Sequence, residues 1–593
     1  MTAQEIRTRI LETVSRNGGH LASSLGAVEL AMALRQTFDP DKDRIVWDVG
    51  HQAYAWKILT GRADRFGTLR QMDGISGFPN PRESTADAAV AGHAGVAISI
   101  AEGYAAARDR RGTDEQVVAV IGDASISNGT SLEALNNCAT ACSKVIVILN
   151  DNEMSISKPT GALSRYLGRL IAGARYNRVK AAVKRLCAAL RLEFLHRAIH
   201  NFKALLKRML FGDKYFEQMG LRYMGPIDGH DLAALKGALE VAKRDDRSVL
   251  LHVVTQKGRG YGPAEQDPTR WHGVGPFALE PDAPSKPGVG PAARGWSEAF
   301  GDALCELAGA DDRIVALTAA MKDGTGLTEF ASRFPKRFYD VGISEGHMVS
   351  FAAGLAAGGM RPVVAVYSTF LQRAVDQVMH DVCIAGLPVV FCVDRAGVVG
   401  ADGVTHQGVY DIAMLKALPN LTICQPKDEE DLKALMREAM VRNGPTVIRY
   451  PRGKVPTAVR APVRSADAAP TCAVWATGDW YVRACEVAER VGGLAVQARY
   501  LKPFDAELLA GQRAAGMKIV SLENGCVAGG FGESIGADVR FGWPDEFVPH
   551  GTQAELERKY GLDADAMVVR IAGFLKDRSV TTPQHLNTTT GNG

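Results

Sequence analysis

Two predicted strands end on short polar side chains that can bind a metal. These apolar runs, 117–121 and 145–149, are followed by Gly122-Asp123 and by Asn150-Asp151-Asn152. Ligands bind outside the carboxyl ends of parallel strands. The carboxylate of Asp123 and the amide of Asn152 are hard oxygen ligands that suit an octahedral Mg²⁺, which also binds phosphate oxygens. We therefore predict a magnesium site that holds a diphosphate.

The alternative is that Asp123 and Asn152 only cap helices or turns. Their pairing, order and spacing, which is that of one strand–helix–strand unit, favour the metal site. Gly122 allows a sharp turn before Asp123. A helix that begins near Asn128 would offer backbone N–H groups to an anion.

The elements that position these residues belong to an α/β protein. The chain has 593 residues, of which 46% are hydrophobic, so it exceeds a single domain. Continuous β-branched runs alternate with helical patterns, which indicates parallel sheets covered on both faces. Segments rich in Pro and Gly, at 280–295 and 453–470, separate three domains. We predict domains at 1–285, 292–455 and 468–576, and a disordered tail at 577–593.

Composition excludes several classes of protein. The net charge of +3 gives no reason to expect a nucleic-acid partner. Ten cysteines form no CxxC pair, so neither a zinc site nor a disulfide framework is indicated, and we expect a reducing compartment. The N-terminus lacks an apolar signal-peptide core, and no segment reads as a transmembrane span. We expect a soluble, cytoplasmic protein.

Residues 161–213 are helical in pattern and rich in Arg and Lys. Such a stretch can bind a membrane surface or cover an anionic ligand. We favour a solvated face in a long insertion. The alternative is a lid that closes over a phosphate.

The Gly-Asp and Asn-x-Asn pair resembles the thiamine-diphosphate-binding motif. Six further stretches are similar to those of 1-deoxy-D-xylulose-5-phosphate synthases, in the family's order and over almost the whole chain. They are SRNGGHLASSLGAVELAMAL (15–34), WDVGHQAYAWKILTGR (47–62), KGRGYGPAEQDP (257–268), YSTFLQRAVDQVMHD (367–381), DRAGVVGADGVTHQG (394–408) and RYPRG (449–453). The resemblance is closer than to transketolase or to pyruvate dehydrogenase E1 subunits.

The resemblance implies two domains of the thiamine-diphosphate-binding fold, a diphosphate-binding and a pyrimidine-binding one, and a C-terminal transketolase-like domain. It implies that pyruvate condenses with D-glyceraldehyde 3-phosphate to give carbon dioxide and 1-deoxy-D-xylulose 5-phosphate, a precursor of isoprenoids, thiamine and pyridoxal. Thiamine diphosphate and Mg²⁺ are the implied cofactors. A homodimer is the implied assembly, with its active site between the first two domains.

The resemblance also implies the roles of individual residues. Asp123, Asn152 and the carbonyl of Met154 would bind Mg²⁺. Glu345 would hydrogen-bond the aminopyrimidine, and burial would raise its pKa. Its small, apolar neighbours in the sequence argue against a salt-bridged surface Glu. The implied catalytic residues are Glu345, His51, His20 and His272. The implied cofactor contacts are His51, Gly92, His93, Gly122, Asp123, Ala124, Ser125, Asn152, Lys257, Glu345 and Phe370.

The acceptor substrate ends in a phosphate, for which arginine is the suited residue. Arg373 and Arg452 match the family's phosphate-binding arginines. Tyr367, Asp402 and His406 accompany them. Taken singly, an Arg is more often a surface ion pair and a Phe after a strand, such as Phe370, is more often core.

The sequence departs from the family pattern at three places. Ala124 replaces a Gly, the segment 94–97 lacks hydroxyl side chains, and Gly346 replaces a Gln. We expect weaker cofactor binding at most, because no group that the chemistry needs is lost. Two other functions stay open: ketol transfer of the transketolase type and an inactive scaffold. The stretches VGADGVTHQG and FLQR argue against the first, and the presence of Glu345, Asp123 and Asn152 argues against the second.

Overall fold

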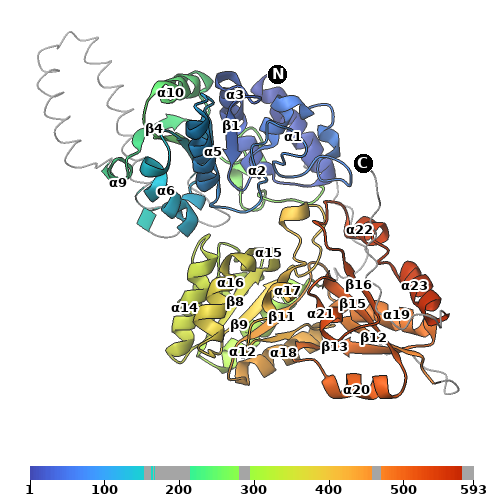
Figure 1. Cartoon of the computed structure of the whole chain (residues 1–593). Coiled ribbons are helices and arrows are strands. Elements are labelled where there is room, and N and C mark those ends of the chain that lie inside the picture. Colours follow the sequence, from blue (N-terminus) through green and yellow to red (C-terminus); the bar gives the residue numbers. More distant parts are fainter. Residues whose placement is uncertain (153–161, 164–165, 167–213, 280–293, 457–468, 577–593) are drawn as a thin grey trace, which may run out of the picture. The chain divides into compact units, whose positions relative to one another are not determined.

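The computed structural model describes residues 1–152, 162–163, 166, 214–279, 294–456 and 469–576 (Figure 1). The chain forms two compact units. Unit 1 is Met1–Pro287 with Gly342–Ser344, and unit 2 is Gly288–Val341 with Glu345–Gly593. Three mainly parallel sheets confirm the predicted α/β class. The units do not separate the second and third predicted domains, and the domain bounds stay a prediction.

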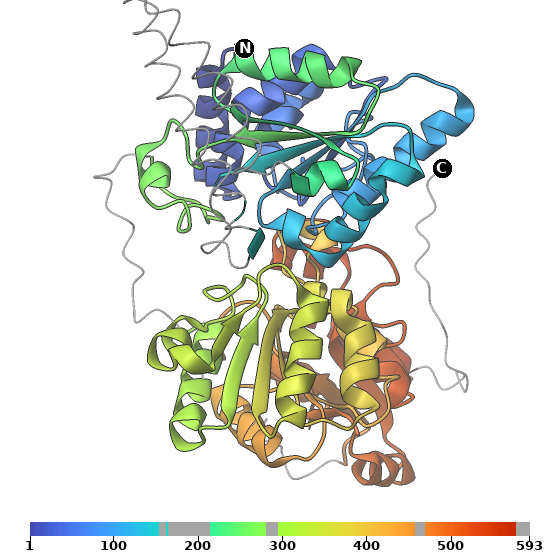
Figure 2. The same cartoon turned by 90° about the vertical axis from the view of Figure 1, so that its left-hand side faces the viewer.

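The sheet of unit 1 is entirely parallel, with the order β1-β2-β3-β5-β4. Its strands are β1 (Arg44–Trp47), β2 (Val117–Gly122), β3 (Ile146–Asp151), β4 (Arg222–Asp228) and β5 (Val249–Val254). Side chains alternate between two cores. Helices cover both faces of this sheet (Figure 2). Val118 and Val120 pack with the helices of the N-terminal segment and α10 (Leu232–Arg244), whereas Ala119 and Ile121 pack with α5 (Ala97–Arg111) and α6 (Gly129–Ala141). This two-sided cover explains the continuous apolar runs.

The helices of unit 1 include α1, which begins with a capping box between Thr2 and Glu5. The main helices are α1 (Ala3–Asn17), α2 (Leu21–Gly26), α3 (Val28–Thr37), α4 (Tyr54–Lys57), α5 (Ala97–Arg111), α6 (Gly129–Ala141), α9 (Lys214–Gln218), α10 (Leu232–Arg244) and α11 (Gly262–Gln266). Asn128 caps α6 through Thr130 N, so this helix begins where the sequence predicts.

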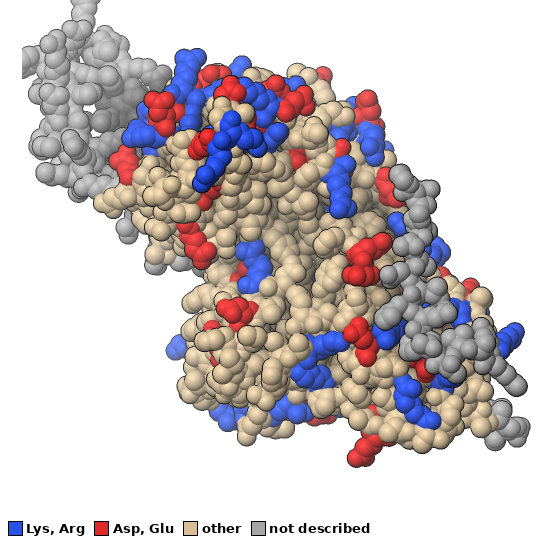
Figure 3. Space-filling model, in the orientation of Figure 1, with Lys and Arg blue, Asp and Glu red and all other residues tan. Residues whose placement is uncertain are grey.

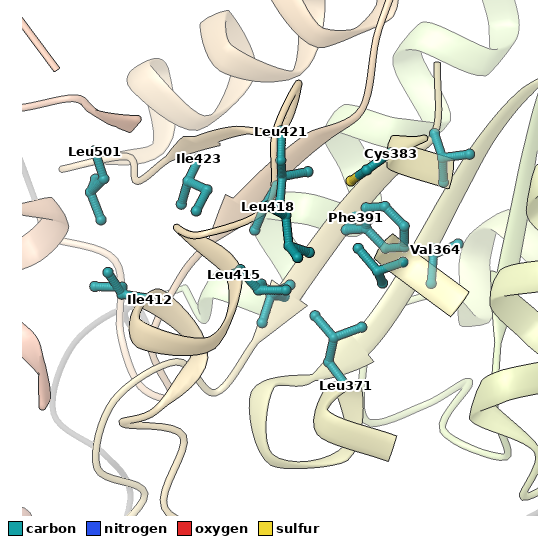
Figure 4. Close-up of a cluster of buried hydrophobic side chains, with 14 of the residues drawn as sticks. Val364, Leu371, Cys383, Phe391, Ile412, Leu415, Leu418, Leu421, Ile423 and Leu501 are labelled. Carbon is teal, nitrogen blue, oxygen red and sulfur yellow. The ribbon is translucent and has the colours of Figure 1, made fainter. Parts of the chain in front are cut away.

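Unit 2 contains a seven-stranded sheet with the order β14-β10-β11-β9-β8-β6-β7. Its strands are β6 (Ile314–Thr318), β7 (Phe338–Asp340), β8 (Arg361–Tyr367), β9 (Val390–Asp394), β10 (Thr422–Cys424), β11 (Thr446–Arg449) and β14 (Tyr500–Lys502). The helices around it are α12 (Trp296–Ala310), α13 (Thr328–Arg333), α14 (Glu345–Ala357), α15 (Ser368–Leu371), α16 (Val375–Gln377), α17 (Asp411–Leu415) and α18 (Glu429–Val441). Only β14 runs antiparallel among these described strands, and its Leu501 joins the core around Ile423 (Figure 4).

A second sheet of unit 2 has the order β13-β12-β15-β16 and is parallel. Its strands are β12 (Cys472–Thr477), β13 (Leu494–Ala498), β15 (Lys518–Cys526) and β16 (Val539–Trp543). Its helices are α19 (Tyr481–Val491), α20 (Ala506–Ala514), α21 (Phe531–Ser534), α22 (Gln553–Lys559) and α23 (Ala564–Lys576).

Two predictions lie mostly or wholly outside the described residues: the basic helical segment 161–213, of which only 162, 163 and 166 are described, and the tail 577–593.

Acidic and basic side chains are interspersed on the face shown in Figure 3, in keeping with the small net charge. Within the described part of the chain, no helix has the length and apolarity that a membrane span requires.

Candidate active site

The register of β2 and β3 brings the predicted metal ligands together. Gly122 pairs with Asn150 in the parallel ladder, so Asp123 and Asn152 follow at the same edge of the sheet. Asn150 itself is engaged, since its Oδ1 accepts a hydrogen bond from Thr255 Oγ1 at 2.7 Å. Asn152 Oδ1 is buried and has no hydrogen-bond partner among the residues that the structure describes. Such an oxygen needs a ligand.

The electrostatics of this edge also fit a cation. Burial raises the pKa of Asp123, and the nearby Asp151 adds to the rise, while Lys257 opposes it. Burial lowers the pKa of Lys257, which Asp123 partly offsets. A divalent cation would stabilise the Asp123 carboxylate in this low-dielectric position. The donor set therefore fits Mg²⁺. Met154, the third predicted ligand, lies outside the described residues.

Three predicted histidines form one cluster in unit 1. The ring centroids of His20, His51 and His272 lie 5.1–5.9 Å apart. Burial lowers the pKa of His272 well below its usual value, and Lys257 and His20 add to this effect. His272 is therefore neutral at pH 7. Phe78, which the sequence did not suggest, lies 5.3 Å from the ring of His20.

A strained turn places His51. Val49 and Gly50 both have left-handed backbone angles, with φ of 58° and 83°. A side chain at Gly50 would meet Pro79 at 2.4 Å, so this position requires glycine. Asp48, two residues earlier, is 1% exposed and accepts hydrogen bonds from the N–H groups of Gly95, Val96 and Ala97. Asp48 thus binds the N–H groups of the two residues that lead into α5 and of its first residue, Ala97.

The remaining predicted cofactor residues of unit 1 lie in loops at these strand ends. Gly92 and His93 precede α5. Ala124 has φ −72°, so its methyl group is accommodated without strain. Ser125 follows in a 3₁₀ turn and lies near enough to Asp48 to lower the pKa of that carboxyl, which burial raises. Asp48 therefore links the turn of His51, the start of α5 and the loop of Asp123, a role that only its place in the WDVGH stretch suggests.

Glu345 lies in unit 2, at the first position of α14. It is 4% exposed, and burial raises its pKa, while Arg373 opposes the rise. Arg373 Nε forms an ion pair with Glu345 Oε2 at 3.2 Å. That oxygen has no hydrogen-bond partner among the described residues. The structure thus places Arg373, a predicted phosphate-binding residue, beside the predicted catalytic carboxyl.

The other predicted substrate residues gather at the ends of β8, β9 and β11. The rings of Tyr367 and Phe370 stack at 5.8 Å, and His406 lies 5.6 Å from Phe370. Arg452 Nη1 lies 3.8 Å from Asp402 Oδ2. Burial raises the pKa of Tyr367 to about 12, and the charges of Arg452 and Asp402 act on it as well.

Arg395 also belongs to this group, although the sequence analysis did not select it. Its guanidinium lies 3.8 Å from the centre of the Tyr367 ring, and its backbone φ is 58°. A left-handed non-glycine residue at a strand end is a mark of functional sites. The signal in the sequence is its position directly after the strand that ends at Asp394.

Residues 292–457 match the family model "Transketolase, pyrimidine binding domain", which together with the parallel sheets defines a transketolase-type enzyme. Residues 1–255 match the model "1-deoxy-D-xylulose-5-phosphate synthase". The chain belongs to the 1-deoxy-D-xylulose-5-phosphate synthase family. It is 46% identical to synthase 1 of Geobacter metallireducens, over 97% of this chain and 96% of that protein, and 46% identical to the synthase of Oleidesulfovibrio alaskensis, over 95% and 93%. The solved transketolase of Leishmania mexicana is 19% identical over 98% of both chains, with a TM-score of 0.44.

Proposed function

We propose that this chain catalyses the decarboxylating condensation of pyruvate with D-glyceraldehyde 3-phosphate to 1-deoxy-D-xylulose 5-phosphate and carbon dioxide. The observation that carries the proposal is the buried carboxyl of Glu345, whose Oε2 accepts no hydrogen bond from a described residue, in a domain of the pyrimidine-binding family. Thiamine diphosphate, when bound, supplies the carbon nucleophile and the electron sink of the reaction.

Glu345 holds a proton on its carboxyl group for exchange with the aminopyrimidine. Because burial favours the neutral carboxyl, this proton is retained closer to neutral pH than on an exposed glutamate. Arg373 limits the rise in pKa, so the carboxyl can also release its proton. His272, which burial keeps neutral, has one ring nitrogen able to accept a proton near the cofactor and pyruvate.

Asp123, Asn152 and Met154 hold Mg²⁺ in this proposal, and Lys257 accompanies the diphosphate. Two properties support the metal: the Asn152 oxygen, which has no hydrogen-bond partner in the part of the chain that the structure describes, and the desolvated Asp123 carboxylate. His20, His51, Gly92, His93, Gly122, Ala124 and Ser125 complete the cofactor contacts, and Phe370 stacks on the pyrimidine.

Arg452, His406, Asp402 and Tyr367 bind the acceptor phosphate end, with Arg373 nearby and Arg395 added from its contact with Tyr367. We further propose a homodimer in the cytoplasm. The described cysteines are free thiols, most of them buried, which suits a reducing compartment. Light scattering coupled to size exclusion tests the dimer.

The deciding experiment measures carbon dioxide release from labelled pyruvate with thiamine diphosphate and Mg²⁺, with and without D-glyceraldehyde 3-phosphate. We expect strong release only with the aldehyde, and loss of it in Glu345→Ala. Release that does not need the aldehyde would indicate a simple decarboxylase. Absence of release would contradict the proposal and favour ketol transfer or an inactive scaffold.

A further inference from the structure

A closed loop of unit 2 carries two of the residues assigned to the acceptor phosphate. Gly397 N donates to Gly408 O, and Gly408 N donates to Gly397 O, both at 2.7 Å. This pair of hydrogen bonds joins the two ends of segment 397–408, which we call the acceptor loop. Asp402 and His406 lie within it, so their positions depend on what holds the loop.

Gln407 connects the acceptor loop to the C-terminal part of the chain. It is 3% exposed. Its Oε1 accepts hydrogen bonds from Val399 N at 2.7 Å and Gly400 N at 3.3 Å, and its Nε2 donates to Pro549 O at 3.0 Å. One side chain therefore fixes the inside of the loop and ties it to the segment that follows β16.

Asn524, on β15, holds the base of the same loop. Its Oδ1 accepts from Trp543 Nε1 at 2.9 Å and from Val398 N at 3.4 Å, and it is fully buried. Gly397 packs directly on this amide: a Cβ there would lie 2.1 Å from the Asn524 side chain, and its φ is +89°. Only glycine can occupy this position.

The loop also has little room to move elsewhere. A Cβ on Gly403 would lie 3.0 Å from His550, and Thr369 Oγ1 donates to Thr405 O at 2.9 Å. Arg452 Nη1 donates to Val399 O at 3.2 Å, so the loop orients this arginine as well. The acceptor loop is thus held by β15 and the segment 549–551 on one side and by α15 on the other.

We propose that the C-terminal domain determines affinity for the phosphate of the acceptor through Gln407 and Asn524, which act as positioning residues without touching substrate. The inference rests on the proposed function. Phosphate recognition by arginine needs accurate geometry, and small misplacements of binding groups are costly. Asp402 and His406, which are assigned to the phosphate, lie within the loop, whereas the residues assigned to pyruvate and the cofactor lie outside it and, among those that the structure describes, only Phe370 contacts it, through His406. The loop should therefore affect the phosphate most.

The test compares Gln407→Met with Gln512→Met in the full-length enzyme. Gln512 is a matched control because it is also buried in unit 2, where it lies on α20 and accepts a hydrogen bond from Trp475 Nε1 at 2.8 Å, outside the loop and the segments that hold it. The readout is KM for D-glyceraldehyde 3-phosphate and for unphosphorylated D-glyceraldehyde. We expect Gln407→Met to raise the first KM about tenfold and to leave the second unchanged, because two hydrogen bonds within the loop and one to Pro549 O are lost.

Gln407→Glu keeps the acceptor for Val399 N and Gly400 N but sets a buried carboxylate oxygen against Pro549 O in place of the donor, so its KM for the phosphorylated acceptor should also exceed that of the wild type. The Gln407→Glu variant also tests the inference if Gln407→Met does not fold. Provided that the wild type is active, either of two results would overturn the inference: equal changes in KM for both acceptors, or an unchanged KM for the phosphorylated acceptor. A wild type without synthase activity would instead overturn the proposed function beneath it.

Discussion

Arg373 Nε lies 3.2 Å from Glu345 Oε2, and this ion pair joins a predicted substrate residue to the predicted catalytic carboxyl. Both side chains are largely buried, at 14% and 5% exposure. A buried carboxyl that keeps one cation nearby has its charged form partly stabilised. The pKa of Glu345 therefore depends on Arg373.

Arg373→Met should make stability more sensitive to pH. Burial raises the folded-state pKa of Glu345 above its ordinary value of 4.5, so the native state binds more protons and stability falls as pH rises above 4.5. Arg373 opposes this rise, so its removal should extend the fall to higher pH. Urea unfolding of the apoprotein at several pH values measures this pH dependence of the free energy of unfolding. In the double variant with Glu345→Gln the extra pH dependence should vanish; its persistence would assign it to another group.

Asp123→Asn should weaken the joint binding of thiamine diphosphate and Mg²⁺ by at least about tenfold, since a charged ligand to the metal is lost. The measurement is the rise in melting temperature as Mg²⁺ is titrated at fixed thiamine diphosphate. Asp231→Asn is the control, because Asp231 caps α10 through Ala233 N and Ala234 N, and Asn preserves a cap. Equal metal responses in the two variants would exclude Asp123 as a ligand.

Glu29→Gln should lower stability at pH 7 by about 1–2 kcal/mol, after allowance for the solvent screening of this half-buried carboxyl, and by less at pH 3. Burial opposes ionisation of Glu29, but hydrogen bonds from His230 and Arg7 outweigh it and lower its pKa to about 2. A carboxyl with a depressed folded-state pKa stabilises the protein above 4.5, and this stability is lost as pH falls towards 2. Urea unfolding at both pH values checks it, and a difference independent of pH would contradict the assignment.

The same substitution should also affect the loop of Lys257. His230 Nε2 accepts a hydrogen bond from Gln256 N at 2.8 Å, and Arg7 Nε donates to Arg259 O at 2.9 Å. Both partners are held by Glu29. Faster amide exchange of residues 256–260 in Glu29→Gln would support this link, and unchanged exchange would oppose it.

Lys57→Met should destabilise unit 1 by about 3–5 kcal/mol, because a buried charge network loses a partner. Lys57 is 0% exposed and its Nζ lies 2.7 Å from Glu83 Oε2 and 4.0 Å from Asp87 Oδ2. Lys42→Met is the matched control. It removes the exposed Lys42–Asp114 pair, whose loss should have little effect on stability because solvent screens the two charges. Denaturant titration of both variants measures the contrast, and similar losses would contradict it.

The sequence was sufficient for the parts of the site that depend on regular structure. Apolar runs predicted β2 and β3, and parallel register then required Asp123 and Asn152 to lie at one edge. The sequence was not sufficient for residues whose position depends on irregular backbone. The left-handed angles of Val49 and Arg395 follow from tertiary packing, so Arg395 and the contact of Phe78 with His20 could not be predicted.

The third domain shows the same limit. The sequence pattern gives one apolar run at 494–500, but the structure divides it. β13 pairs in the C-terminal sheet, whereas β14 pairs with β10 of the seven-stranded sheet. Between them Arg499 binds Glu438 of α18 with two hydrogen bonds. Neither strand propensity nor the period of the apolar residues indicates that a chain will pass from one sheet to another within two residues.

The pairing of β14 with β10 means that unit 2 cannot be divided by cutting the chain near residue 460. A fragment that ends there would expose the N–H and C=O groups of β10 and the apolar faces of Ile423 and Leu421. An uncovered strand edge of this kind is a template for intermolecular β-pairing, so the fragment should aggregate. We therefore expect the two predicted domains of unit 2 to fold together, so that a split enzyme would need co-expression of the two halves rather than refolding of either alone.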